Sequence, residues 1–322
     1  MNTPLLDVRN LKVYFSLKKK GFLRRGIESL RAVDDVSWSI SEGETLGIVG
    51  ESGCGKTTVA RALLRLVNSN GGEAFFQGKD IMKMSERDFH SVRRNMQMIF
   101  QDPYDSLDPR RTVGSIIGEP LAIFEKIPPR ARNERVVELM EMVGLRSEVL
   151  HRFPHQFSGG QRQRISIARA LTLNPKLILC DEAVSALDVS IQAQILALLK
   201  DLQKRLHLAY VFISHDLGVV RYLSHSIAVM YLGRIVERGK SSELFEEPLH
   251  PYTQGLLASI PLPDPGREYQ GNRLSGDLPS PVNPPSGCPF HPRCPEAISR
   301  CSEDVPLERE VLPGRFCRCH LR

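Results

Sequence analysis

The stretch that decides the fold is Gly50-Glu51-Ser52-Gly53-Cys54-Gly55-Lys56-Thr57, which follows the apolar run Leu46-Gly47-Ile48-Val49. It fits the pattern G-x-x-x-x-G-K-[ST] of phosphate-binding loops. The apolar run suits a strand buried in a parallel sheet, and residues 57–64 read as a helix whose N-terminus carries partial positive charge. Glycines let the backbone turn sharply, so that its N–H groups face phosphate oxygens. The stretch therefore predicts an α/β fold that binds a nucleoside triphosphate.

The residue types within this loop have separate uses. Lys56 supplies a mobile cation for the β- and γ-phosphates, and the Thr57 hydroxyl is a ligand for Mg²⁺. Cys54 stands at a variable position, and we assign it no catalytic role. A glycine-rich turn can match the pattern by chance, but the flanking strand and helix argue against that. The predicted nucleotide contacts of this loop are Gly50, Glu51, Ser52, Gly53, Cys54, Gly55, Lys56, Thr57 and Thr58.

A second apolar strand, Leu177-Ile178-Leu179-Cys180, ends in the acidic pair Asp181-Glu182. The carboxyl edge of a parallel sheet is the usual place for a ligand. Two adjacent carboxylates are costly to desolvate there unless a cation or strong donors accompany them. The pair therefore indicates a functional site, while the simpler alternative is an acidic pair that caps the next helix.

A third motif, Phe157-Ser158-Gly159-Gly160-Gln161, lies about a hundred residues after the phosphate loop. The apolar spacing after it predicts a helix whose Ser/Gly-rich start exposes N–H groups to an anion. A generic helix N-cap would explain Ser158 but not the whole segment. In this order the three motifs resemble those of the ATP-binding cassette family, in which two such chains sandwich ATP. The resemblance implies that Ser158, Gly159, Gly160 and Gln161 contact the γ-phosphate held by a partner cassette.

The same resemblance implies roles for five residues at strand ends and loops. Asp181 holds Mg²⁺ directly or through water, and Glu182 polarises the attacking water as general base. Gln101, in Ile99-Phe100-Gln101-Asp102-Pro103, reports the γ-phosphate and Mg²⁺ to a helical subdomain. His215 contacts the γ-phosphate, and Asp188 belongs to a loop that crosses to the partner. The expected catalytic residues are Glu182, His215 and Gln101, and the expected Mg²⁺ ligands are Thr57, Gln101 and Asp181.

An aromatic residue that stacks on adenine is also expected early in the chain. Phe15 is the first choice and the neighbouring Tyr14 the alternative. A core aromatic on a first strand would explain either residue nearly as well.

Composition agrees with this interpretation. The chain has 322 residues, which is enough to bury a large core. Its net charge is +6. It has no apolar run of about 20 residues that would span a bilayer, and its first residues do not resemble a signal peptide. We therefore expect a cytoplasmic protein. The basic run Lys18-Lys19-Lys20 with Arg24-Arg25 could contact a membrane surface, a permease loop or nucleic acid, or form a solvated turn.

The expected architecture is a P-loop cassette with a mainly parallel core sheet. Strands are predicted near 5–15, 31–40, 44–50 and 73–76, including an antiparallel β subdomain. Residues from about 103 to 157 lose strand character, and 131–143 show helical spacing, so an inserted helical subdomain is expected there. Strands and helices alternate again from 177 to about 240. The predicted division is a nucleotide-binding domain at 1–260 and an irregular, proline-rich, cysteine-containing extension at 261–322.

Three segments narrow the resemblance to the oligopeptide/dipeptide importer group of cassettes. They are residues 102–110, residues 153–157 and His250-Pro251-Tyr252-Thr253-Gln254-Gly255-Leu256-Leu257. The group implies pairing with a second, different ATPase subunit on two permease subunits at the cytoplasmic face of the membrane, a solute-binding protein acting indirectly, and no nucleic acid. Uptake of a related solute, such as nickel, glutathione or an oligosaccharide, and a soluble cassette ATPase outside transport are the alternatives.

Five of the seven cysteines lie in the last 35 residues. In a cytosolic protein such clustering favours metal or redox chemistry over disulfides. The spacing of Cys288, Cys294, Cys301 and Cys319 resembles the terminal iron–sulfur segment of dipeptide-type cassettes, and four thiolates suit a [4Fe–4S] cluster. Zn²⁺ and unliganded thiols are the alternatives. Cys317 has no assigned role and could exchange with Cys319.

Overall fold

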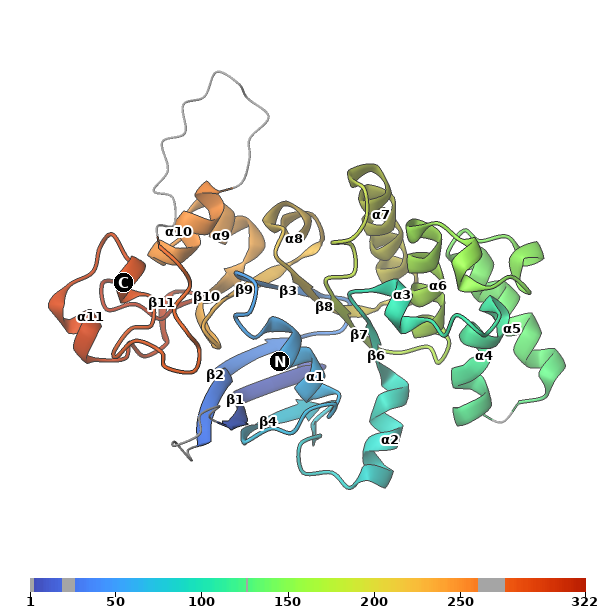
Figure 1. Ribbon diagram of the computed structural model, residues 1–322, viewed down its shortest axis with the longest axis horizontal. Helices are drawn as coiled ribbons and strands as arrows, with labels where there is room; N and C mark the ends of the chain where they lie inside the picture. The colour runs from blue at the N-terminus through green and yellow to red at the C-terminus, as the bar shows by residue number, and fades with distance from the viewer. Residues whose placement is uncertain (1–2, 19–26, 126, 260–275) are drawn as a thin grey trace, which may run out of the picture. The chain divides into compact units, whose positions relative to one another are not determined.

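A computed structural model describes residues 3–18, 27–125, 127–259 and 276–322 of the chain (Figure 1). These residues form two compact units. The first comprises residues up to 40, 46–82 and 214–322, and the second comprises 41–45 and 83–213. Nearly all of the basic run of residues 18–25 lies outside the described residues.

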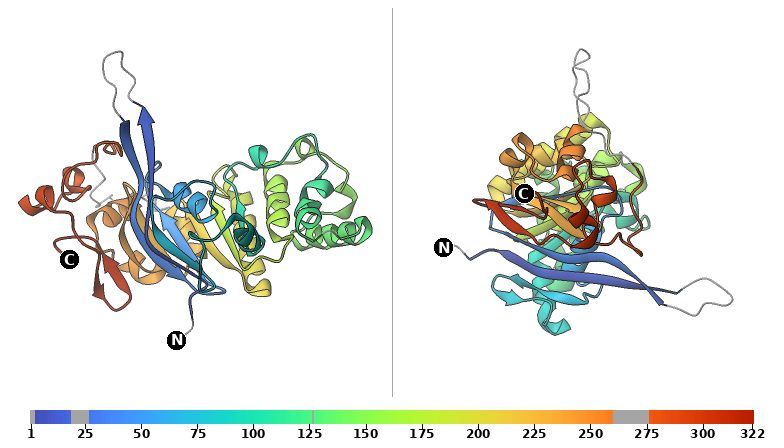
Figure 2. Two further views of the ribbon diagram at one scale, coloured as in Figure 1. Left: turned by 90° about the horizontal axis from the view of Figure 1, so that it is seen from below. Right: turned by 90° about the vertical axis from the view of Figure 1, so that its left-hand side faces the viewer.

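The first unit contains a four-stranded antiparallel sheet in the order β2-β1-β4-β5. Its strands are β1 (Leu6–Lys18), β2 (Ile27–Ile40), β4 (Gly71–Phe76) and β5 (Lys79–Asp80). The two long N-terminal strands, β1 and β2, run side by side (Figure 2). One face of the sheet is apolar, with Val8, Val13, Val36 and Ile40 all buried, as expected when a strand covers a core on one side. The predicted antiparallel subdomain is confirmed.

A second set of strands in this unit carries the phosphate loop. β3 (Thr45–Val49) pairs in parallel with β9 (Ser226–Tyr231), and β9 pairs antiparallel with β10 (Arg234–Lys240). Helix α1 (Lys56–Leu63) follows the loop. The remaining helices before residue 260 are α8 (Leu217–Leu223), α9 (Ser241–Glu246) and α10 (Pro251–Ala258). The strand, loop and helix therefore succeed one another as predicted.

The C-terminal extension is more regular than its prolines suggested. Residues 276–290 have no helix or strand, but η3 (His291–Arg293), α11 (Ser299–Glu303), β11 (Arg309–Leu312) and β12 (Arg315–Cys317) follow. β12 pairs antiparallel with β10, and β11 pairs with β12. Arg315 and Glu237 form an ion pair at this junction at 3.2 Å, with both side chains at least 95% buried. An irregular extension is therefore the wrong description after residue 290, because a buried charge pair and a strand pairing fix it.

The second unit combines a parallel sheet with the helical insertion. β6 (Met96–Ile99), β7 (Leu177–Asp181) and β8 (Ala209–Ser214) are parallel neighbours. The helices are α2 (Glu86–Asn95), α3 (Pro103–Ser106), α4 (Val113–Phe124), α5 (Pro129–Met142), η1 (Ser147–Val149), η2 (Pro154–Gln156), α6 (Gly159–Leu171) and α7 (Val189–Leu206). The described residues between 103 and 157 contain no strand. α5 matches the helix predicted at 131–143.

The cores of both units are apolar. β7 and β8 are buried along their whole length, as is typical of parallel strands covered on both faces. In the part of the chain that the structure describes, no helix combines the length and the apolar character needed to cross a bilayer.

Candidate nucleotide-binding site

The phosphate loop joins β3 to α1 in the first unit, and two of its glycines are required by the space around them. A Cβ on Gly50 would lie 2.2 Å from the carbonyl oxygen of Met230. Gly55 has φ of +106°, and a Cβ there would lie 2.0 Å from the carbonyl oxygen of Ala32. Both contacts are with backbone atoms, so no side chain can be accommodated by a rotamer change. The glycine pattern therefore fits a loop held against two strands, in the conformation that aims backbone N–H groups at an anion.

Lys56 is folded back into the loop. Its Nζ donates to the carbonyl oxygens of Gly50 at 2.7 Å and Glu51 at 3.0 Å, and its side chain is buried. The Sγ of Cys54 lies 3.9 Å from the same Nζ. Burial raises the pKa of the Cys54 thiol, so this cysteine is held as a neutral filler of the loop. The lysine charge is thus kept at the loop by backbone acceptors that a phosphate could replace.

Glu51 is held by residues that sequence reasoning did not select. Its backbone N–H donates to the hydroxyl of Tyr252 on α10 at 3.0 Å. Its carboxylate accepts from both terminal nitrogens of Arg293, at 2.7 and 3.1 Å. Tyr252 and Arg293 lie 201 and 242 residues from Glu51 in the sequence. No local pattern indicates contacts over such a separation, although Tyr252 stands in one of the segments that indicated the importer group.

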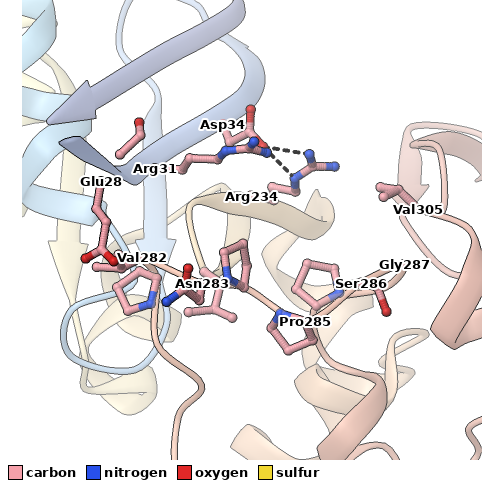
Figure 3. A pocket seen from close by; sticks show the side chains of 15 residues that line it. Glu28, Arg31, Asp34, Arg234, Val282, Asn283, Pro285, Ser286, Gly287 and Val305 are labelled. Carbon is pink, nitrogen blue, oxygen red and sulfur yellow. Dashed lines mark hydrogen bonds and ion pairs between the residues drawn. The ribbon is translucent and has the colours of Figure 1, made fainter. Parts of the chain in front are cut away.

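The two candidates for adenine stacking, Tyr14 and Phe15, have different surroundings on β1. The Tyr14 hydroxyl donates to Asp34 at 2.6 Å, and burial together with this hydrogen bond raises the pKa of Tyr14 to about 12. Asp34 is also paired with Arg234 at 2.6 Å (Figure 3). Phe15 is 36% exposed. The Tyr14 hydroxyl is therefore held in a polar network, whereas the Phe15 side chain is partly open to solvent, which supports the first choice.

A cavity of about 580 Å³ in the first unit lies beside this Asp34–Arg234 pair. It is lined by the N-terminal part of β2, including Glu28 and Arg31, and by residues 281–287 of the extension (Figure 3). None of the predicted nucleotide contacts lines it. The cavity is therefore distinct from the phosphate loop.

The acidic pair lies at the end of β7 in the second unit. Asp181 is the last residue of the strand and only 1% exposed. Glu182 has φ of +46°, an uncommon conformation for a residue with a side chain and one that clusters at functional sites. Its N–H donates to the carbonyl of Ile213 on β8 at 2.9 Å. Two successive carboxylates therefore lie at the carboxyl end of β7.

Gln101 reaches this pair from the end of β6. Its amide nitrogen donates to the Glu182 carboxylate at 3.1 Å. The structure thus brings together two of the three residues predicted as catalytic. His215, the third of these residues, comes directly after β8 in the sequence. It belongs to the first unit, and its side chain is exposed.

The third motif forms the start of α6. Ser158 accepts from the N–H of Gln161 at 3.3 Å, and the Gln161 side chain accepts from the N–H of Ser158 at 3.1 Å. This reciprocal capping box explains both side chains locally. Gly160 is constrained as well, since a Cβ would lie 2.4 Å from Ile191. Ser158, Gly159 and Gln161 are exposed, and so is Asp188, which precedes α7. The helix start is thus both capped and accessible to a ligand.

In the extension, a backbone hydrogen bond links two of the cysteines. The N–H of Cys288 donates to the carbonyl of Cys301 at 2.8 Å. Burial, followed by the charges of Cys301, Cys319 and Cys294, raises the pKa of the Cys288 thiol to about 11. Cys317 is different: it is fully buried in β12, and burial followed by the charge of Glu237 raises its pKa. Among the described residues, no three His, Cys, Asp or Glu side chains are arranged to hold a metal ion.

Two family models match the chain. A model described as "ABC transporter" matches residues 33–185. A model described as "Oligopeptide/dipeptide transporter, C-terminal region" matches residues 236–301. The matches cover the phosphate loop and the acidic pair in the first case, and the region from β10 to α11 in the second.

Two ATP-binding proteins are similar to this chain over nearly its whole length. An oligopeptide transport ATP-binding protein, AppF, of Bacillus subtilis is 52% identical over 98% of this chain and 97% of its own length. A probable peptide ABC transporter ATP-binding protein, y4tS, of Sinorhizobium fredii is 51% identical over 100% of this chain and 91% of its own. Among solved structures, cbiO1 from Clostridium perfringens, part of the ABC transporter complex cbiONQ, matches with a TM-score of 0.65 and 25% identity over 76% of this chain and 92% of that chain. The dimeric ATP-binding cassette MJ0796, bound to ADP and Pi, matches with a TM-score of 0.64 and 28% identity over 73% of this chain and 98% of that chain.

Proposed function

Because the chain belongs to the ATP-binding cassette transporter ATPases, we propose that it hydrolyses ATP to energise the import of oligopeptides or dipeptides through a membrane permease. The observation that carries the proposal is the identity of about half of all residues, over nearly the full length, with ATP-binding proteins named for peptide transport. The C-terminal region of oligopeptide/dipeptide transporters supports it independently. The chain supplies the ATPase, while the path for the peptide belongs to the permease at whose cytoplasmic face it would bind.

We assign roles in hydrolysis to the residues predicted from the sequence. The backbone N–H groups of residues 50–57 and the Lys56 ammonium bind the β- and γ-phosphates, and Phe15 stacks on adenine. The Thr57 hydroxyl, the Asp181 carboxylate and the Gln101 amide oxygen are hard oxygen donors of the kind that Mg²⁺ prefers. That ion neutralises charge on the phosphates when it is bound.

Glu182 is the proposed general base. Its carboxylate accepts the Gln101 hydrogen bond, so one side of it is oriented while the other can take a proton from water. His215 is assigned a contact with the γ-phosphate, supported by its exposed position directly after β8.

A second cassette is required to complete each site. Ser158, Gly159, Gly160 and Gln161 lie at an exposed helix start, which is suited to a γ-phosphate presented by another chain. Asp188 would lie at the same junction. A different cassette chain is the preferred partner, with two permease subunits beneath the pair and a solute-binding protein that delivers the peptide to them.

We further propose that Cys288, Cys294, Cys301 and Cys319 hold a [4Fe–4S] cluster. The spacing of these four cysteines in the sequence supports this choice, as does the hydrogen bond from the N–H of Cys288 to the carbonyl of Cys301 at 2.8 Å. Zn²⁺ is the alternative ion for the same thiolates. Such a cluster would order the extension and takes no part in the steps above.

Reconstitution tests the proposed function. The chain should be purified with its permease subunits and partner ATPase, placed in proteoliposomes and supplied with the solute-binding protein and labelled di- and oligopeptides. ATP-dependent peptide uptake is expected, and it should disappear with Lys56→Ala. Uptake of nickel, glutathione or an oligosaccharide without peptide uptake would replace the peptide by that solute. ATP hydrolysis without association with any permease would favour a cassette outside transport.

A further inference from the structure

The C-terminal extension reaches the phosphate loop through one side chain. The guanidinium of Arg293 meets the Glu51 carboxylate with two parallel hydrogen bonds, at 2.7 and 3.1 Å. The Arg293 side chain is 5% exposed and that of Glu51 is 29% exposed. Paired hydrogen bonds between a planar guanidinium and a carboxylate are among the stronger charged contacts in proteins. The contact therefore joins the phosphate loop to the C-terminal extension, across 242 residues of sequence.

Arg293 is positioned by an aromatic cluster rather than by the ion pair alone. It ends η3, three residues after Phe290, which is 1% exposed. The Phe290 ring packs against Tyr231 at 5.3 Å and Tyr252 at 5.4 Å between ring centroids. Tyr231 ends β9, and Tyr252 lies on α10. Since these rings fix the segment that carries Arg293, the position of its guanidinium does not depend on the ion pair alone.

The charge of Glu51 needs a partner at this position. The carboxylate belongs to the loop whose backbone is built to surround a polyanion, and a second negative charge there would oppose binding. The Lys56 Nζ donates to backbone oxygens of the loop, whereas the Glu51 carboxylate is paired with Arg293. Neutralising Glu51 leaves the positive charge of Lys56 and the helix start available to the phosphates.

We propose that Arg293 is a positioning residue that sets the affinity for ATP by neutralising Glu51. The inference rests on the proposed function, namely that residues 50–57 bind ATP. It assigns to the extension a direct effect on the nucleotide site of the same chain. In this role Arg293 acts on the nucleotide through Glu51.

The test is equilibrium binding of a fluorescent ATP analogue to the full-length chain with Mg²⁺, in the wild type and in four variants. Arg293→Met should raise the dissociation constant about tenfold, because the Glu51 charge is left unpaired. The defect should shrink at high salt, which screens charge repulsion. Glu51→Gln is the reference chain without the carboxylate, whatever its own affinity. Adding Arg293→Met to that chain should change the dissociation constant by less than about threefold, since no carboxylate remains to be neutralised.

Arg318→Met is the matched control. Arg318 is another buried arginine of the extension, paired with Asp35 on β2 at 3.1 Å. Its loss should lower the unfolding midpoint as much as the loss of Arg293 without changing ATP affinity. This separates an effect on the loop from a general weakening of the extension.

Three results would overturn this inference and leave the proposed function standing. They are wild-type affinity in a folded Arg293→Met chain, an Arg293→Met defect that is as large in the Glu51→Gln chain as in the wild type, and Arg318→Met with the same binding defect. If Arg293→Met does not fold, Arg293→Gln takes its place, and wild-type affinity in that variant overturns the inference in the same way. A wild-type chain that does not bind ATP, or one that is insensitive to Lys56→Ala, would instead overturn the proposed function, and this inference with it.

Discussion

The side-chain amide of Gln101 donates a hydrogen bond to the carboxylate of Glu182 at 3.1 Å across 81 residues of sequence. Gln101 follows β6 and Glu182 follows β7, and these strands are parallel neighbours. Their carboxyl ends therefore meet at one edge, which is where ligands bind in such sheets. The contact holds the proposed base at the point where the helical insertion begins.

Replacement of the proposed base should separate binding from turnover. Glu182→Gln is expected to keep ATP affinity within about threefold while hydrolysis falls at least about a hundredfold, because general base catalysis acts on the transition state. Gln101→Ala should cause a smaller loss, since it removes only the orienting hydrogen bond. Lys56→Ala should weaken binding itself. Phosphate release and nucleotide binding, measured on the same preparations, check all three. Full turnover in Glu182→Gln, with a hydrolysis-deficient partner cassette, would contradict the assignment.

Hydrolysis should depend on a second cassette. Because the start of α6 is proposed to complete a site on another chain, the isolated protein is expected to hydrolyse ATP slowly. The rate per molecule should rise with protein concentration and on addition of the partner ATPase. Gly160→Val, which places a side chain against Ile191 at the helix start, should abolish that stimulation while ATP binding to the chain itself persists. A rate per molecule that stays high at dilutions where the protein is monomeric would refute the dependence.

The cysteines of the extension should behave as a set of four. Protein purified without oxygen is expected to be brown, to absorb near about 400 nm and to contain about four iron and four sulfide per chain. Serine at Cys288, Cys294, Cys301 or Cys319 should bleach or destabilise the chromophore, whereas Cys54→Ser, Cys180→Ser and Cys317→Ser should not. Iron, sulfide and zinc analysis decides the matter. Stoichiometric zinc without iron in anaerobic protein would replace the cluster by a zinc site.

Buried His250 should make stability depend on pH. Burial, and then the charge of Arg322, lower its pKa from 6.5 to about 3, while its Nδ1 accepts from the N–H of Tyr252 at 3.0 Å. The unfolded chain takes up this proton near pH 6.5 and the folded chain does not. The stabilising contribution is therefore complete above pH 6.5 and falls as the pH is lowered toward 3, by about 2 kcal/mol at pH 5.

Denaturant unfolding of wild type and His250→Asn between pH 7 and pH 5 measures this contribution. Asparagine can still accept a hydrogen bond at the start of α10, so the variant should be less stable at pH 7 but lose less stability on acidification. Equal slopes for the two proteins would show that another group is responsible.

The local elements could be predicted because their causes are local. The glycine spacing of residues 50–57 requires a turn that few other sequences can make, and the apolar runs at 46–49 and 177–180 have the length of buried strands. The apolar period of 131–143 similarly predicted α5. Gln101 was singled out by the resemblance to a family, and the structure places its amide 3.1 Å from the Glu182 carboxylate. Nothing in the sequence near Gln101 indicates that contact.

The sequence by itself thus determined the phosphate loop, the acid-tipped strand, the helical insertion and the grouping of cysteines, since each follows from residue types over a short stretch. Only the tertiary structure decided that β12 pairs with β10 and that the Tyr14 hydroxyl donates a hydrogen bond to Asp34. It also decided that Arg293 pairs with Glu51 across 242 residues. These relationships depend on which side chains are desolvated together. A buried charge selects its partner by the free energy of the whole packed arrangement, and that energy has no signature in neighbouring sequence.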